Sequence, residues 1–218
     1  MGGDRLSIFR QWLARILILR PIPSLITGES TGATLEPKPD TTNFGGWFTG
    51  LLNDVPAAYN AIERYLKAMM PDFHDVRNLK DGGREYRTLS VQFSTDLGSV
   101  LIPFRDLSDG EKCFMICALV LAMNDFFGPA FCLWDEPDNH LALSEVGHFV
   151  MDLRRSFEAR GQFIATSHNP EAIRTFSNEN TLVLYRRSHL EPTQVRLLSE
   201  IQVNGDLINA LILGDLEP

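Results

Sequence analysis

The 218-residue sequence predicts an α/β fold built on a mainly parallel sheet flanked by helices. Hydrophobic residues make up 44% of the chain, which is enough for a packed core rather than a disordered segment. The second half alternates short apolar runs with longer segments of helical periodicity. Apolar strands that alternate with helices are typical of a parallel sheet buried on both faces.

The first part of the chain, residues 1–80, predicts helices joined by an irregular connection. Residues 4–19 carry apolar side chains at helical spacing with arginines between them, which predicts an amphipathic helix. Residues 21–46 are rich in Pro, Gly, Ser and Thr and predict a long irregular connection. Residues 55–69 repeat the helical spacing, and Pro71 ends the helix.

The remaining residues, 81–218, predict a β-hairpin followed by alternating helices and strands. The turn Asp81-Gly82-Gly83 precedes two runs of β-formers at residues 86–93 and 99–104. Helices are expected at about 110–126, 143–159 and after Pro170, and strands at 131–134, 162–166, 181–185 and 195–198. In such sheets ligands bind beyond the carboxyl ends of the strands, so the residues after the strands at 131–134 and 162–166 are the expected site of chemistry.

Composition narrows the class of function and the compartment. A net charge of -8 argues against a surface that binds nucleic acid throughout, because phosphate neutralisation needs clustered Lys and Arg. The three cysteines each lie in an apolar run, which predicts buried thiols in a reducing compartment. The apolar stretch at 113–123 is too short for a bilayer, which takes about 20 residues. We therefore expect a cytoplasmic protein with no membrane partner.

The strand expected at 131–134 ends in two adjacent carboxylates. Asp135 at a strand end can hold Mg²⁺ directly or through water, and Glu136 beside it can polarise a water that attacks a phosphate. Two neighbouring buried carboxylates repel each other unless a cation offsets the repulsion. The simpler alternative is a solvated acidic strand end.

Two further positions suit a phosphate. His168 follows the next strand, where an imidazole can donate a hydrogen bond to a phosphate oxygen. Ser108 or Asp109 can cap the helix that follows, and Gly110 lets a ligand approach the backbone amides, so this helix start is an anion site. Taken singly, both features have ordinary structural alternatives, a hydrogen-bonded histidine and a helix cap.

Together, in order and spacing, three segments resemble motifs of the ABC-type P-loop ATPases. They are Leu107-Ser108-Asp109-Gly110-Glu111-Lys112, similar to the signature motif; Phe131-Cys132-Leu133-Trp134-Asp135-Glu136-Pro137, similar to Walker B; and Phe163-Ile164-Ala165-Thr166-Ser167-His168, similar to the switch histidine. The resemblance is to the stand-alone, non-transporter AAA-family branch related to the RecF, SMC and overcoming-lysogeny-defect ATPases, of the AbiEii-like kind. It implies that residues 81–218 form the C-terminal lobe of such an ATPase and that residues 1–80 correspond to its helical insertion.

The resemblance also implies a role for each matching residue. Asp135 would support Mg²⁺, Glu136 would be the general base for the attacking water, and His168 would contact the γ-phosphate. The residues implied to contact nucleotide, partly across a dimer interface, are Ser108, Asp109, Gly110, Glu111 and Asn139. Asp109 replaces the second glycine of the signature motif, and Glu111 replaces the glutamine found in transporters. ATP and Mg²⁺ are the expected ligands, and an ATP-driven homodimer is the expected assembly.

No Walker A phosphate loop is found in the sequence. The lysines are Lys38, Lys67, Lys80 and Lys112, and none follows a glycine, whereas the loop needs a Gly-Lys pair to hold the triphosphate. Residues 27–34, the best candidate, lack both the spacing and the lysine. We therefore expect the chain alone to bind ATP weakly, to be inactive, and to work with a P-loop-bearing partner.

Two other functions stay open at this point. One is a catalytically silent module that docks on a P-loop-bearing partner. The other is a metal-dependent phosphoesterase or nuclease whose metal ligands would be Asp135, Asp138, His140 and His168. The resemblance implies DNA-related or defence work, with DNA, a nuclease or a toxin as further partners.

Overall fold

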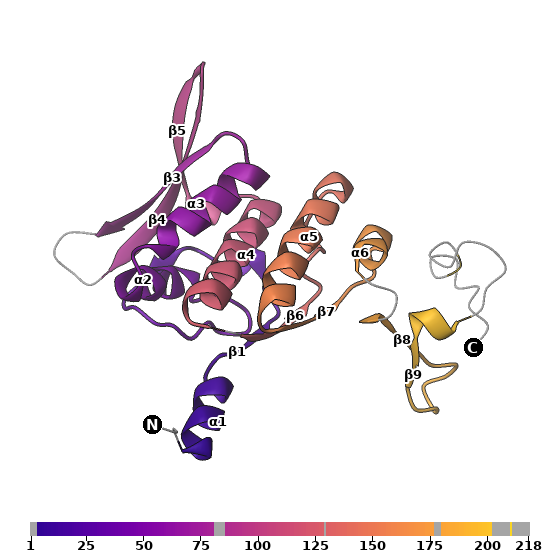
Figure 1. The fold of residues 1–218 in the computed structure, drawn as a ribbon. Coiled ribbons are helices and arrows are strands. Elements are labelled where there is room, and N and C mark those ends of the chain that lie inside the picture. The colour runs from indigo at the N-terminus through magenta and orange to yellow at the C-terminus, as the bar shows by residue number, and fades with distance from the viewer. Residues whose placement is uncertain (1–3, 81–85, 129, 177–179, 202–209, 211–218) are drawn as a thin grey trace.

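The computed structural model describes residues 4–80, 86–128, 130–176, 180–201 and 210 (Figure 1). Its helices and strands are α1 (Arg5–Leu13), β1 (Ile16–Leu19), β2 (Glu29–Ser30), α2 (Phe44–Asp54), α3 (Ala58–Met69), β3 (Phe73–Lys80), β4 (Arg87–Thr95), β5 (Gly98–Pro103), α4 (Asp109–Phe126), β6 (Phe131–Asp135), α5 (Leu143–Ala159), β7 (Gln162–Thr166), α6 (Pro170–Thr175), β8 (Leu182–Tyr185) and β9 (Gln194–Leu197). The α/β class predicted from the sequence is confirmed.

A three-stranded parallel sheet in the order β1-β6-β7 forms the centre of the fold. Helices α4 and α5 lie over one face of this sheet (Figure 1). The side chains of β1 and β6 on that face are buried and those of β7 are half-buried, and Trp134 packs edge-on against Phe149 of α5 with ring centroids 5.8 Å apart. The sheet therefore has one well-packed face, and the carboxyl ends of its three strands lie side by side.

Among the described residues, most of the opposite face of the parallel sheet is open, which corrects the expectation of a sheet buried on both faces. The exception is Phe131, whose ring lies 6.2 Å from that of Trp12 of α1. Ile18, Leu133 and Ile164 are paired in register and form a row across this face. Ile18 is 54% exposed and Ile164 is 50% exposed. No strand among the described residues pairs with the outer edge of β7. Most of this face and the edge are thus uncovered in this part of the chain.

The prediction of one N-terminal helix over residues 4–19 is wrong for the second half of this segment. Helix α1 begins after Asp4, whose carboxylate accepts from the backbone N–H of Leu6, and ends at Leu13. Residues 16–19 instead form β1, because this unbroken apolar run pairs with β6. The residues of α1 are not buried, and the helix projects from the body of the molecule (Figure 1).

Helix α2 was not predicted: it begins in the last three residues of the segment expected to be irregular, 21–46, and continues to Asp54. Its aromatic residues are buried, and Phe44 stacks on Phe104 with centroids 4.7 Å apart. Its glycines face the backbone of the preceding loop, where the N–H of Thr34 donates to the carbonyl of Gly46 at 3.0 Å. A Cβ at Gly50 would lie 2.2 Å from the carbonyl oxygen of Thr34. The glycines therefore let loop and helix backbones touch.

A second sheet has the strand order β2-β4-β3, with β5 paired to β4, and it packs against α2 and α3. The hairpin predicted before the long helix is confirmed as β4 and β5. Strand β3 was not predicted, and it pairs antiparallel with β4. The boundary expected at residue 80 thus falls between two paired strands. The predicted turn Asp81-Gly82-Gly83 lies outside the described residues.

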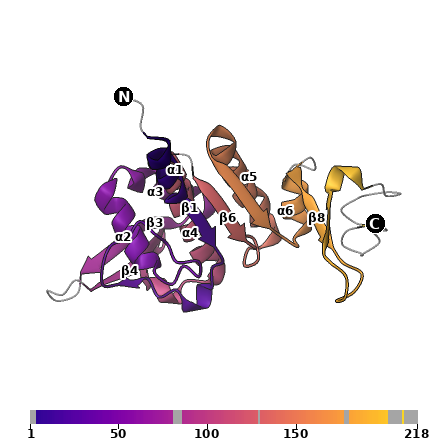
Figure 2. The ribbon, with the colours of Figure 1, turned by 90° about the horizontal axis from the view of Figure 1, so that it is seen from below.

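Strands β8 and β9 do not continue the parallel sheet. They pair with each other antiparallel, within the described part of the chain. Figure 2 shows β8 beyond α6, at the end of the molecule opposite α2 and β4. The expectation that these segments are strands is confirmed, whereas their place in the parallel sheet is corrected.

The cysteines are free and buried, as predicted. Burial raises the pKa of Cys113 to about 12 and that of Cys132 to about 12, so these thiols stay protonated and unreactive at neutral pH. None of the described helices combines the length and apolar character needed to cross a membrane.

Candidate functional site

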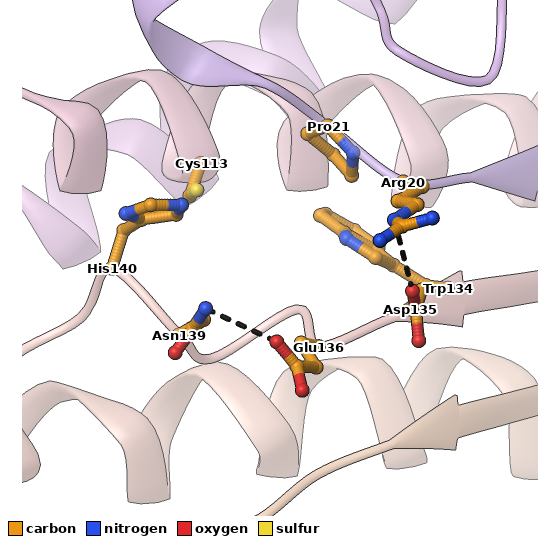
Figure 3. Close-up of a pocket in the computed structure, with 8 residues that line it drawn as sticks. All are labelled: Arg20, Pro21, Cys113, Trp134, Asp135, Glu136, Asn139 and His140. Carbon is orange, nitrogen blue, oxygen red and sulfur yellow. Dashed lines mark hydrogen bonds and ion pairs between the residues drawn. The ribbon is translucent and has the colours of Figure 1, made fainter.

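Asp135 ends the middle strand of the parallel sheet and is held from both sides. Thr166, at the end of β7, donates its hydroxyl to Oδ1 of Asp135 at 2.5 Å. Arg20, directly after β1, places its Nε 3.3 Å from Oδ2 (Figure 3). The two neighbouring strands therefore each supply one donor to this carboxylate.

Glu136 lies at a sharp turn directly after this strand. Its φ of +49° is in the left-handed region, which costs a non-glycine residue about 1–2 kcal/mol. The turn is fixed by the backbone N–H of Glu136, which donates to the Thr166 hydroxyl at 3.0 Å. As a result, the side chain leaves the strand direction and faces the loop that follows.

The Glu136 carboxylate contacts two other residues predicted for the site. The side-chain amide of Asn139 donates to Oε2 at 3.1 Å (Figure 3), and Nε2 of His168 lies 3.5 Å from Oε1. Glu136 is 39% exposed and His168 is 93% exposed. The structure thus brings together Asp135, Glu136, Asn139 and His168 at a surface open to solvent.

A partly buried hydrogen bond joins the two loops that carry these residues. The hydroxyl of Ser167 donates to Oδ2 of Asp138 at 2.9 Å, and Asp138 is only 4% exposed. The other carboxylate oxygen of Asp138 is buried without a partner among the described residues. Burial raises the pKa of Asp138, although the Ser167 hydrogen bond opposes this shift.

This raised pKa predicts how stability depends on pH. The folded state favours the protonated form of Asp138. The contribution of this group to the free energy of unfolding is therefore fully present below the pKa of Asp in the unfolded chain, and it is lost as the pH rises through the pKa of Asp138 in the folded protein. Asp138→Asn keeps the acceptor for Ser167 and carries no charge. In urea unfolding we expect this variant to match the wild type within about 1 kcal/mol near pH 4 and to become progressively the more stable protein toward pH 8. A stability difference that does not change with pH would contradict the assignment.

The start of α4 carries the residues that resemble a signature motif. The Ser108 hydroxyl oxygen accepts from the backbone N–H of Glu111 at 3.2 Å, and the Glu111 carboxylate accepts from the N–H of Ser108 at 2.7 Å. This capping box occupies Glu111, but the Ser108 hydroxyl hydrogen is still available to a ligand. The predicted helix cap is therefore confirmed.

The same helix start lies against the loop that follows Glu136. Oδ2 of Asp109 is 3.7 Å from Nδ1 of His140, and a Cβ at Gly110 would be 3.0 Å from the His140 carbonyl oxygen. Ser108, Asp109, Gly110 and Glu111 thus form one cluster and Asp135, Glu136 and His168 another, with the loop at 138–141 between them.

A cavity of about 240 Å³ lies beside Asp135 and Glu136. It is lined by Arg20, Pro21, Cys113, Trp134, Asp135, Glu136, Asn139 and His140 (Figure 3). Sites that enclose a whole small ligand typically measure about 300–1,000 Å³. The size suits the phosphate end of a nucleotide better than the nucleotide as a whole.

The donor set at this edge suits Mg²⁺ rather than a metal caged by protein ligands. The described residues include no group of three or more His, Cys, Asp or Glu side chains placed to hold a metal ion. Asp138 faces Ser167 and His140 faces Asp109, so the four ligands proposed for a phosphoesterase or nuclease do not converge. Mg²⁺ usually keeps several waters and takes one or two carboxylates, and Asp135 at the strand end is a carboxylate that can serve in this way.

Three residues near the site escaped the sequence reasoning. Arg20 follows the helix expected at 4–19, and neither Arg20 nor Thr166 had an assigned role. Lys112 is 3% exposed and donates to the carbonyls of Pro23 and Arg105 at 3.1 and 3.0 Å, which fixes α4 against the segment after β1. The position of Arg20 could have been predicted from the run Ile16–Leu19 before it, because this run of β-formers favours a strand over the continuation of a helix.

The fold is similar to that of solved ATPase head domains. An Smc head domain with a coiled coil from Pyrococcus yayanosii matches with a TM-score of 0.57 and 15% identity, over 79% of this chain and 32% of that one. An Smc head from Pyrococcus furiosus, bound to the C-terminal domain of ScpA, matches with a TM-score of 0.54 and 16% identity, over 80% and 42%. The chain thus spans about a third of the length of the first of these and has the fold of an SMC-type ATPase head.

A further match is a structure of SMC ATPases concerned with ATP-driven dimerization and DNA-stimulated activation, with a TM-score of 0.50 and 20% identity over 75% of this chain and 94% of that one. No curated protein matches the sequence. The model of the family described as "AAA domain, putative AbiEii toxin, Type IV TA system" matches residues 7–174. The chain belongs to this AAA family, and the resemblance to an AbiEii-like ATPase is confirmed.

Proposed function

We propose that the chain is the C-terminal lobe of an ABC-type ATPase site, which is completed by a segment carrying a phosphate-binding loop. The observation that carries this proposal is the position of Glu136, which directly follows the middle parallel strand, next to Asp135, and contacts both Asn139 and His168. A carboxylate held in this way can accept a proton from a water that attacks a phosphate. The match to the AAA family supports the same chemistry.

Each residue of the site has a task in this proposal. Asp135 helps to hold Mg²⁺, which when bound offsets the negative charge of the phosphate oxygens. Glu136 takes the proton of the attacking water, Asn139 and His168 orient its carboxylate, and His168 donates to the γ-phosphate. The hydroxyl of Ser108 and the amides at the start of α4 offer donors to a phosphate held by a second subunit.

The open face and edge of the parallel sheet support the need for a completing segment. Parallel sheets are covered on both faces in nearly all proteins, whereas here Ile18, Leu133 and Ile164 form an uncovered apolar row. A strand added to β7 would end beside Thr166 and His168, because the carboxyl ends of parallel strands lie at one edge. A phosphate-binding loop after such a strand would face Glu136.

The assembly we propose is a homodimer, or a complex with a P-loop-bearing partner, in which ATP lies between two subunits. Work on DNA or in defence, alongside a nuclease or toxin, fits the family description. The buried free thiols fit the cytoplasm, where we place the protein.

The test is to purify the complex from its native host through a tag on this chain and to measure ATP hydrolysis. We expect the complex to hydrolyse ATP in a Mg²⁺-dependent manner, and the chain alone to bind ATP weakly in isothermal titration. Micromolar affinity of the isolated chain for ATP, or a complex that contains a phosphate-loop protein yet lacks hydrolysis, would overturn the proposal.

A silent docking module is the second candidate, because the sequence has no Gly-Lys pair and the apolar face of the sheet is open. It predicts that the same complex hydrolyses ATP at an unchanged rate when Glu136 is replaced. The Glu136 variant described in the Discussion separates the two functions.

A further inference from the structure

Asp135 lies in the middle of a row of three side chains, one from each strand of the parallel sheet. Leu19 is paired in register with Trp134, so the next residues, Arg20 and Asp135, are neighbours across β1 and β6. Asp135 is in turn paired with Thr166 of β7. The sheet register therefore brings a guanidinium and a hydroxyl to the two sides of one carboxylate.

Both oxygens of that carboxylate are engaged by this row. Oδ1 accepts from the Thr166 hydroxyl at 2.5 Å, and Oδ2 lies 3.3 Å from Nε of Arg20. The Arg20 backbone is fixed, because its N–H donates to the carbonyl of Pro39 at 2.7 Å. Its side chain is 81% exposed, however, and exposed ion pairs are weak. The guanidinium can therefore leave Asp135 without disturbing the fold.

The charges of Arg20 and Asp135 suggest that this ion pair competes with a bound cation. Among the described residues that line the cavity, Arg20 is the only arginine or lysine, and it pairs with Asp135, while Glu136 also lines the cavity. A divalent cation at Asp135 would meet the positive charge of Arg20 at short range and repel it. A phosphate that arrives with the cation would offer the released guanidinium a new anionic partner.

We propose that Arg20 neutralises the charge of Asp135 in the absence of a divalent cation and that the cation displaces Arg20 when it binds. Competition with Arg20 therefore sets the affinity of the site for the cation. This inference rests on the proposed function only in assigning Asp135 to the cation. Arg20 is a positioning residue here: it keeps the carboxylate paired before the cation binds and turns toward phosphate afterwards.

The test is a titration of the full chain with Mn²⁺ alone, followed by electron paramagnetic resonance at an ionic strength of about 0.02 M. We expect Arg20→Gln to tighten Mn²⁺ binding by about five- to tenfold, and the gain to shrink toward about twofold at roughly 0.5 M salt. Arg20→Lys keeps the charge and should stay near the wild type. The matched control is Arg105→Gln, which removes an exposed arginine paired with Glu29 at 3.9 Å and should leave the affinity unchanged within about twofold.

A second readout follows Arg20 itself. In the wild type, saturating Mg²⁺ should shift the Nε–Hε NMR signal of Arg20, and in Asp135→Asn it should not. The inference would be overturned if Arg20→Gln bound Mn²⁺ no more tightly than the wild type, or if Arg105→Gln gained as much affinity as Arg20→Gln. It would also be overturned if Asp135→Asn bound Mn²⁺ as well as the wild type, or if no variant bound Mn²⁺ at all. Hydrolysis by the purified complex is not part of this titration, so failure here is distinct from failure of the proposed function.

Discussion

ATP hydrolysis by the purified complex is expected to fall by about 10²- to 10⁴-fold when Glu136 is replaced by glutamine. The substitution keeps the shape of the side chain and an oxygen that accepts from Asn139, but it removes the group that takes the proton from water. Binding of Mg²⁺ and ATP should persist, because Asp135 and the start of α4 are unchanged. The ATP-bound assembly should therefore accumulate, which size-exclusion chromatography in the presence of ATP detects.

Glu158→Gln is the matched control for this prediction. Glu158 is an exposed residue of α5 that pairs with Arg154 at 3.0 Å, so its replacement removes the same charge on a different face of the molecule. Hydrolysis by this variant should stay within about twofold of the wild type. Hydrolysis that survives in Glu136→Gln at the wild-type rate would remove Glu136 from the role of general base and favour the silent module.

Gly50→Ala is expected to destabilise the fold by about 3 kcal/mol, in spite of the higher helix propensity of alanine. The new Cβ would lie 2.2 Å from the carbonyl oxygen of Thr34 and 2.5 Å from its carbonyl carbon, and both atoms belong to backbone that cannot move aside alone. Either α2 or the loop before it must shift, which disturbs the aromatic core around Phe44 and Trp47. For a chain of this size the loss corresponds to a fall in melting temperature of roughly 10 °C, measurable by calorimetry.

Gly32→Ala provides the comparison on the loop side of the same contact. A Cβ at Gly32 would have no atom within 4 Å, so this variant should unfold within about 1 kcal/mol of the wild type. If Gly50→Ala were as stable as Gly32→Ala, the close approach of α2 to the loop would not exist in solution.

Much of the second half of the fold was predictable from sequence, because its signals are local. The helix at α4, the strands β6 and β7 and the helix α5 follow from apolar periodicity and from the capping pair Ser108 and Glu111. The grouping of Asp135, Glu136 and His168 was likewise predictable, since parallel strands end at one edge of a sheet.

The first half was harder because its structure depends on distant partners. Residues 16–19 continue the helical spacing of the residues before them but are also a β-prone apolar run, and their pairing with β6 decides in favour of a strand. The glycines of α2 lower its helix propensity and suggest a loop, although they are there for a backbone contact. Arg20 could be placed beside Asp135 only after β1 was known, so this member of the site depended on the fold.

The uncovered edge of β7 also bears on how the protein behaves when it is produced alone. Among the described residues this edge is unpaired, and Ile164 of β7 is a half-exposed apolar residue, so the edge is a template for aggregation. The isolated chain should therefore self-associate as its concentration rises and become more soluble when made together with the segment that we propose completes the site. Gain of solubility on co-production thus offers a practical screen for the proposed partner.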